Sequence, residues 1–302
     1  MSYKKKVLDI INILFISCVV FFTYRLFSKK KNINENLTNF EDKKDLNKSD
    51  NKYVCVYAYY EKNEEYKNNL IHFLEKGGIQ FNIDYYIVIN GKCTIELPNY
   101  SNLKIIYREN KGFDFGGWQN IIKNHIQKSY EYYVFMNSSV RGPFPEGKSW
   151  IDHFLPLFNS SKDVKMVGTT INIFDNGFWV DMKPIYQKDG PYSHIQSMFF
   201  ILNSEGYEFL NQNKFFDDEV ILNTRTDINY MIINKEIMMS QLIIKNGWNI
   251  NCILPKYRDL DYREVKSNIN PSGCDPYYRG AYFGGTIQPE EVVFYKSYRL
   301  HD

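Results

Sequence analysis

The stretch Arg108-Glu-Asn-Lys-Gly-Phe-Asp-Phe-Gly-Gly-Trp118 decides how this chain is expected to fold. It follows an apolar run at residues 103–107, which is typical of a buried strand, and it precedes a helical pattern at residues 119–128. Three glycines and Asp114 therefore lie where a strand passes into a helix. In open α/β sheets ligands bind at such places, because backbone N–H groups and helix N-termini face the crevice. A tight turn that only packs the helix on the sheet is the alternative interpretation.

Strand-like and helix-like segments alternate on both sides of this stretch. A helix is expected after Asn63, which can cap it, and further helices are expected at residues 204–212 and 235–246. Strands are expected at residues 53–59, 84–90, 103–107, 132–136, 164–170, 197–202 and 250–254. The alternation predicts an α/β domain over residues 53–302, with a mostly parallel, Rossmann-like sheet flanked by helices.

The N-terminus has the pattern of a membrane anchor. Residues 7–27 form an apolar segment of 21 residues between two groups of lysines, which is about one bilayer crossing. We therefore expect a cytoplasmic tip and signal-anchor transmembrane helix at residues 1–28, followed by a flexible polar stem at residues 29–52. This arrangement predicts a single-pass type II membrane protein whose domain faces the lumen of the secretory pathway, the ER or Golgi. A cleaved signal peptide is the alternative, although no small-residue cleavage site is present.

Composition and charge exclude several classes of protein. Apolar residues make up 44% and charged residues 24% of the 302 residues, which is typical of a globular chain. Residues 1–52 hold 11 Lys and Arg against 6 Asp and Glu, a net charge of +5, so the overall +2 leaves a net −3 for the rest. A domain of net negative charge gives no electrostatic reason to expect nucleic-acid binding. The five cysteines show no metal-binding spacing.

A second group of polar residues, Asn137-Ser-Ser-Val-Arg-Gly-Pro-Phe144, directly follows the strand expected at residues 132–136. Together with the stretch at residues 108–118, it resembles glycosyltransferases of the GT-A fold. More closely, the chain resembles the rhamnan-synthesis F-type and related eukaryotic and viral glycosyltransferase-like proteins over most of residues 53–299. The other motifs that carry the resemblance are Val167-Gly-Thr-Thr170, His194-Ile-Gln-Ser197, Glu236 with Ser240, and Pro289-Glu-Glu-Val-Val-Phe-Tyr-Lys296.

The resemblance implies a glycosyltransferase, of hexosyltransferase type, for glycan biosynthesis. Such an enzyme transfers a sugar from a nucleotide-sugar donor to a glycan or glycoprotein acceptor. Asp114 would accept a hydrogen bond from the ribose or the base, although an acid that only caps the following helix is an equal alternative. The residues expected to bind the nucleotide sugar are Arg108, Asn110, Gly112, Asp114, Gly116, Gly117, Asn137, Ser138, Ser139, His194, Lys296 and Arg299.

The same resemblance makes the need for a metal an open question. GT-A enzymes carry an Asp-x-Asp motif where this chain has Asn137-Ser138-Ser139, and Mn²⁺ or Mg²⁺ prefers carboxylate oxygens. We therefore expect no metal ligands, with Asn137, Ser139 and His301 as weak candidates. In a metal-independent reaction Arg141 would take part of the metal's role against the leaving diphosphate. An arginine that only fixes the Gly-Pro turn is the alternative.

Two acids are candidates for the proton transfer that an inverting reaction needs. Glu236 is the first candidate for the base, at the start of the helix expected at residues 235–246, and Asp227 is the second. The alternative for Glu236 is an acid that complements the helix dipole. Two functions compete with a transferase: a non-catalytic protein that binds a nucleotide or sugar, and a membrane-tethered interaction protein of the same fold.

Overall fold

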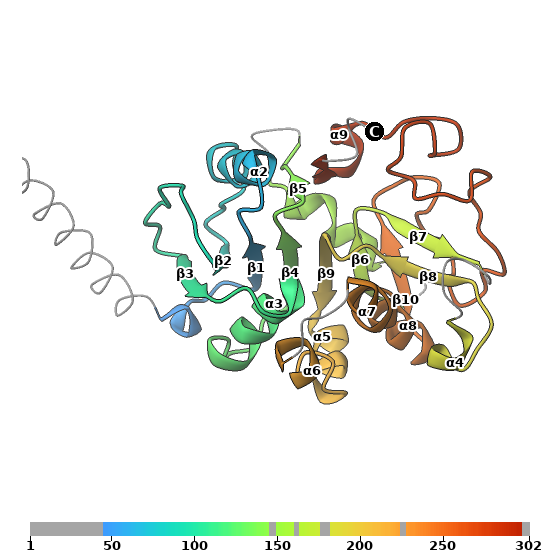
Figure 1. Cartoon of the computed structure of the whole chain (residues 1–302), viewed down its shortest axis with the longest axis horizontal. Helices are drawn as coiled ribbons and strands as arrows, with labels where there is room; N and C mark the ends of the chain where they lie inside the picture. Colours follow the sequence, from blue (N-terminus) through green and yellow to red (C-terminus); the bar gives the residue numbers. More distant parts are fainter. Residues whose placement is uncertain (1–44, 145–148, 160–162, 176–181, 224–227, 298–302) are drawn as a thin grey trace, which may run out of the picture. The chain divides into compact units, whose positions relative to one another are not determined.

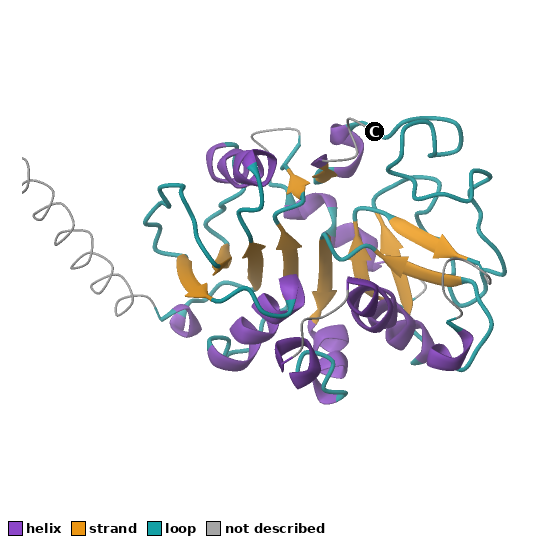
Figure 2. Ribbon diagram, viewed as in Figure 1, coloured by secondary structure: helices purple, strands orange, loops and turns teal. Residues whose placement is uncertain are grey.

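A mixed sheet forms the centre of the protein. The computed structural model describes residues 45–144, 149–159, 163–175, 182–223 and 228–297, and within them seven strands pair in the order β10-β6-β9-β4-β1-β2-β3 (Figures 1 and 2). Every pairing is parallel except those of β9 with β4 and β6. The strands are β1 (Tyr53–Tyr59), β2 (Ile83–Asn90), β3 (Leu103–Arg108), β4 (Tyr132–Asn137), β6 (Val164–Gly168), β9 (Phe199–Asn203) and β10 (Asn249–Cys252). The expected mostly parallel α/β sheet is therefore confirmed.

Two short antiparallel ribbons lie beside this sheet. One pairs β5 (Val140–Arg141) with β11 (Tyr295–Lys296), and the other pairs β7 (Ile171–Phe174) with β8 (Tyr192–Ile195). The strand expected at residues 164–170 ends at Gly168, where a Cβ would lie 2.3 Å from Cγ2 of Ile195. The chain then continues into β7, which the sequence pattern did not separate from β6.

Helices pack on the sheet through their apolar faces. They are α2 (Glu64–Glu75), α3 (Phe113–Asn124), α5 (Ser204–Gln212), α6 (Glu219–Asn223), α7 (Ile228–Met231) and α8 (Met238–Lys245), with short helices η1 (Leu46–Lys48), η2 (Ile151–His153), η3 (Leu155–Asn159), α4 (Lys183–Tyr186) and α9 (Pro289–Val292). As expected, Asn63 caps α2, since its side chain accepts a hydrogen bond from the Tyr66 N–H at 3.0 Å. Helix α3 packs on β1 and β2, whereas α8 packs on β6, β8 and β10.

Two expected helix starts are wrong. Helix α3 begins at Phe113 rather than at residue 119. Gly112, with a φ of 74°, is its N-cap, and Gly116 and Gly117 are its fourth and fifth residues, so the glycine-rich stretch is part of the helix. The helix expected from residue 235 continues from α7 through the π-helical segment η4 (Ile232–Ile237). Every second residue of η4 is buried, so its apolar pattern does not have the 3.6-residue period by which a helix is predicted from sequence.

The N-terminal predictions fall largely outside the described residues. The expected anchor at residues 1–28 and most of the expected stem lie there, and the described helices include none with the length and hydropathy of a membrane span. The last residues of the expected stem belong to the folded part of the chain. Leu46 is buried, and the Asn47 amide donates to the His125 carbonyl at 3.0 Å. The compact unit of the described chain accordingly begins at Leu46.

Candidate functional site

Trp118 fixes helix α3 over the end of β4. Its side chain is fully buried, with its ring edge-on to those of Phe115, Phe135 and Phe200. Its indole N–H donates to the Met136 carbonyl at 3.3 Å. Asp114 lies four residues earlier, one helical turn away, and is thereby held at the carboxyl end of the sheet.

Glycines let this helix approach the sheet closely. A Cβ on Gly116 would lie 2.0 Å from the Lys111 carbonyl oxygen, and a Cβ on Gly117 would lie 3.2 Å from the Asn90 amide nitrogen. The Arg108 guanidinium holds the same loop, since it donates to Asn90 Oδ1 at 2.6 Å and to the Lys111 carbonyl at 2.8 Å. The predicted binding residues Arg108, Gly112, Gly116 and Gly117 thus shape the helix entry, and Asn110 lies exposed beside it.

Asp114 and Asn137, which are 23 residues apart, meet between α3 and β4. The Asn137 amide donates to Asp114 Oδ2 at 2.7 Å. Burial raises the pKa of Asp114 to about 7; the Asn137 hydrogen bond opposes this shift, and the negative charge of Glu236 adds to it. Asp114 therefore changes charge near neutral pH, which is a property of groups at functional sites.

Asn137, Ser138 and Ser139 form a turn whose polar groups bind the protein itself. Asn137 Oδ1 accepts from the Ser139 N–H at 2.9 Å and from its hydroxyl at 2.6 Å. The Ser138 hydroxyl accepts from the Tyr60 N–H at 2.7 Å and connects β4 to the end of β1. A divalent cation prefers several carboxylate oxygens, and this turn offers none, so Asn137 and Ser139 do not fit such a metal. The described residues also contain no group of three His, Cys, Asp or Glu side chains placed to hold one.

Glu236 lies within η4, not at a helix start, and faces the corner between β8 and β9. Its Oε2 accepts from the Ser197 N–H at 2.7 Å and from the Ser197 hydroxyl at 2.5 Å. The interpretation of Glu236 as an acid at a helix N-terminus is therefore wrong, because α7 and the first four residues of η4 precede it. The two hydrogen bonds fix the carboxylate toward the carboxyl end of the sheet.

His194 is fully buried next to this carboxylate. Its Nδ1 lies 2.9 Å from the Tyr192 carbonyl, so Nδ1 carries the proton, because a carbonyl can only accept. Burial lowers the pKa of His194, the charges of Glu236 and Asp275 oppose this change, and the charge of Lys296 adds to it. The ring is therefore neutral at neutral pH. Its Nε2 is a buried acceptor without a hydrogen-bond partner among the described residues.

The β5–β11 ribbon separates Arg141, which was predicted to act on the diphosphate, from Lys296, which was predicted to bind the nucleotide sugar. Lys296 lies opposite Val140, and Arg141 lies opposite Tyr295. Since neighbouring residues of a strand point to opposite faces, Lys296 and Arg141 face different sides of the ribbon. Lys296 influences His194, whereas the exposed Arg141 lies on the other face.

The described structure thus brings Asp114, Asn137, Glu236, His194 and Lys296 to one end of the sheet. Three predicted residues, Asp227, Arg299 and His301, lie outside the described residues. We missed Asp275 and Gln196, which are both buried and joined by a hydrogen bond of 2.8 Å from the Gln196 amide to Asp275 Oδ2. These two residues are 79 positions apart, and no local pattern in the sequence connects them.

Comparison with known proteins identifies one family. Residues 89–272, more than half of the chain, match the family model described as rhamnan synthesis protein F. No curated protein sequence shows significant similarity to the chain. The match to a family model therefore stands without a closely related curated sequence beside it.

Three solved structures to which this chain is similar are glycosyltransferases. Galactosyltransferase LgtC in complex with donor and acceptor sugar analogs has 12% identity, coverage of 80% of this chain and 86% of that chain, and a TM-score of 0.37. The mannosyltransferase PcManGT from Pyrobaculum calidifontis in complex with GDP-Man and Mn²⁺ has 8% identity, coverage of 68% of this chain and 55% of that chain, and a TM-score of 0.39. The apo-form glycosyltransferase GlyE from Streptococcus pneumoniae TIGR4 has 9% identity, coverage of 66% of this chain and 44% of that chain, and a TM-score of 0.34. Similarity at this level does not assign a function.

Proposed function

Since the protein belongs to the rhamnan synthesis protein F family, we propose that it is a glycosyltransferase that moves a sugar from a nucleotide-sugar donor to a glycan or glycoprotein hydroxyl. One observation supports this most directly. Asp114, Glu236, His194 and Lys296, which are far apart in sequence, interact at the carboxyl end of the parallel strands, where open α/β sheets bind ligands.

The donor nucleotide would lie at the entry of helix α3. Asp114 can accept a hydrogen bond from a ribose hydroxyl there, and the Asn137 amide keeps its carboxylate in place. The Asn90 amide nitrogen and the Tyr57 hydroxyl are buried nearby without hydrogen-bond partners among the described residues, whereas the Asn90 amide oxygen accepts from Arg108. Buried polar groups normally have partners, so unpaired donors at the end of a sheet favour a ligand that completes them.

Lys296 is the better placed cation for the leaving diphosphate. It lies on the face of the β5–β11 ribbon that interacts with His194, whereas Arg141 points to the other face. A cation at this position would stabilise the charge that develops on the diphosphate as the glycosidic bond breaks. The turn at Asn137 does not fit a metal, and we propose that the reaction needs none there.

Glu236 is proposed as the base that takes the proton of the acceptor hydroxyl. Ser197 holds its Oε2 with two hydrogen bonds, so that the carboxylate keeps one orientation while the acceptor binds. His194 is the second choice, because its neutral ring offers a buried acceptor at Nε2. A base in this position contributes about 10²- to 10⁴-fold to a rate.

The test is a panel of nucleotides and nucleotide sugars, nucleoside-diphosphate rhamnose included, with the full-length protein. We expect one donor to raise the melting temperature in Mn²⁺ and equally in EDTA, since a ligand of the native state stabilises it. Glu236→Gln should keep this shift and lose at least about a hundredfold in transfer rate. The exposed Glu290→Gln on α9 serves as the matched control. Full transfer activity in Glu236→Gln would contradict its assignment as the base. No shift in melting temperature with any nucleotide would contradict the proposed transferase function.

A non-catalytic nucleotide- or sugar-binding protein is the second candidate. The turn Asn137-Ser138-Ser139 favours it, because no carboxylate stands where related transferases carry two. Binding of a donor without transfer to any acceptor in the same panel would select it. We further propose, from residues 1–52, that the protein is a type II membrane protein with its domain in the secretory lumen. Protease protection of the domain in sealed microsomes tests this orientation.

A further inference from the structure

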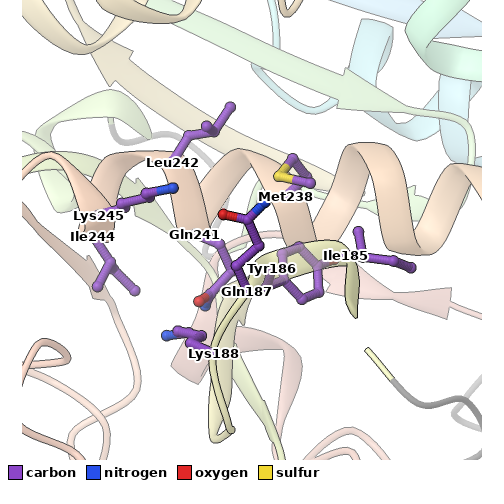
Figure 3. A pocket seen from close by; sticks show the side chains of 9 residues that line it. All are labelled: Ile185, Tyr186, Gln187, Lys188, Met238, Gln241, Leu242, Ile244 and Lys245. Carbon is purple, nitrogen blue, oxygen red and sulfur yellow. The ribbon is translucent and has the colours of Figure 1, made fainter. Parts of the chain in front are cut away.

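A cavity of about 610 Å³ lies between α4 and α8, away from the residues assigned to donor binding and transfer. Figure 3 shows Gln241, Leu242 and Lys245 of α8 on one side of it, and Gln187 and Lys188 of the segment after α4 on the other. Its volume falls within the range of about 300 to 1,000 Å³ that is usual for small-molecule sites. None of the predicted site residues lines it.

The cavity wall combines apolar and polar groups. Tyr186, Met238 and Leu242 provide an apolar surface beside two amides. The Gln241 amide donates to the Ser193 carbonyl at 2.7 Å, whereas its Oε1 is buried without a hydrogen-bond partner among the described residues. Gln241 is only 5% exposed. A buried oxygen without a partner is costly, and a hydroxyl group of a ligand would satisfy it.

Two lysines, Lys188 and Lys245, line this cavity without carboxylate partners in the described part of the chain. Lys183 of α4, which does not line the cavity, pairs with Asp189 at 3.1 Å, but Lys188 and Lys245 have no such ion pair among the described residues. The pKa of Lys188 is lowered by burial. An anion between the two lysines would offset the desolvation that this shift reflects.

We propose that this cavity binds an acidic saccharide. The carboxylate or phosphate of the sugar would lie between Lys188 and Lys245, a ring hydroxyl would donate to Gln241 Oε1, and the apolar face of the ring would pack on Tyr186. The acidic sugar would be part of the acceptor, and this role as an acceptor rests on the proposed transferase function. Binding itself does not depend on turnover.

The cavity is connected to Glu236 through α4. The Tyr186 hydroxyl donates to the Ile233 carbonyl in η4. Met182, Tyr186, Tyr192, Ile233 and Ile237 form a small hydrophobic cluster apart from the main core. A saccharide on Tyr186 therefore contacts the element that packs directly against the segment carrying Glu236.

Isothermal titration of the full-length protein tests the proposal with three probes. They are a hyaluronan tetrasaccharide, which is acidic, the neutral chitotetraose, and inorganic phosphate. We expect the acidic tetrasaccharide to bind at least about tenfold more tightly than chitotetraose. The double substitution Lys188→Ala and Lys245→Ala should remove this preference, and Gln241→Met should weaken both sugars. Lys183→Ala, on α4 five residues before Lys188 but paired with Asp189, is the matched control.

Other outcomes would overturn the proposal. Equal affinity for the acidic and neutral sugars would overturn the proposed acidic-saccharide site. So would a loss of the preference in Lys183→Ala as large as that in the double variant. Phosphate that binds as tightly as the acidic tetrasaccharide would leave an anion site without sugar recognition. The donor panel keeps the two proposals apart. Nucleotide stabilisation without acidic-sugar binding defeats only this inference, and acidic-sugar binding without nucleotide binding defeats only the transferase.

Discussion

Asp114 shows how one residue can serve the fold and a candidate site at once. Its position depends on Trp118, which fixes α3 to the sheet, and on Gly116, where a Cβ would lie 2.0 Å from the Lys111 carbonyl oxygen. The carboxyl group is consequently held against Asn137, and burial raises its pKa to about 7. A carboxyl group held in this way opposes folding once it must ionise.

We expect Asp114→Asn to stabilise the protein at about pH 8 and to leave its stability unchanged at about pH 4. Between the ordinary pKa of 3.8 and the native value of about 7, the unfolded chain loses the proton that the folded protein keeps, so stability falls as pH rises. The upper limit is about 4 kcal/mol, and the partial exposure of Asp114 reduces the expected gain to about 1–2 kcal/mol. Urea unfolding at both pH values measures it, with the exposed Asp152→Asn as control. A gain that is the same at both values would contradict the shifted pKa.

Single residues of the site could be predicted when a motif marks them at the end of a strand. Asp114 and Asn137 were found in this way, because each follows a recognisable apolar run. Their contact with each other, and the pairing of Gln196 with Asp275, depend on how the strands are ordered in the sheet. Hydrogen bonds between residues 79 positions apart leave no periodic signal in the sequence.

Among the elements, η4 differs most from the sequence prediction, and it carries the proposed base. The strands β1, β2 and β4 were predicted well because each is a short, nearly continuous apolar run, as expected for strands covered on both faces, whereas the two short ribbons were not predicted. Segment η4 buries Lys235 as well as isoleucines, and its π-helical turn departs from the period that reveals a helix. The Lys235 ammonium pairs with Asp218 at 2.9 Å and donates to the Phe215 carbonyl at 2.8 Å.

We expect Lys235→Met to destabilise the protein by about 3 kcal/mol, because it leaves Asp218 without its partner in a largely buried position. Adding Asp218→Asn should recover part of this loss, since the uncompensated charge is then removed as well. Urea unfolding of the wild type, both single variants and the double variant gives the coupling between the two residues. A double variant no more stable than Lys235→Met alone would show that the pair does not hold η4.

At the scale of the whole molecule, one end of the sheet carries the candidate binding site and the opposite end contributes to stability. The carboxyl ends of the parallel strands carry the partly unpaired polar groups of the candidate site. The opposite end is closed around Asp84, which is fully buried at the start of β2. Asp84 accepts from the Tyr130 hydroxyl at 2.9 Å and from the Asn51 amide at 2.8 Å, and it pairs with Lys128 at 3.3 Å. Stability and ligand binding should therefore be separable by mutation.

Asp84→Ala tests this separation, because it removes the common acceptor and leaves Lys128, Tyr130 and Asn51 without it. We expect a loss of about 3–5 kcal/mol in the free energy of unfolding, as for other broken buried ion pairs. The affinity for the donor nucleotide should change by less than about twofold, since the substitution is at the far end of the sheet. Glu131→Ala, which breaks an exposed pair with Lys52 at 2.7 Å near the same end, should cost little stability. If Asp84→Ala weakened nucleotide binding while the protein remained folded, the two ends of the sheet would be coupled, and the division of tasks between them would be wrong.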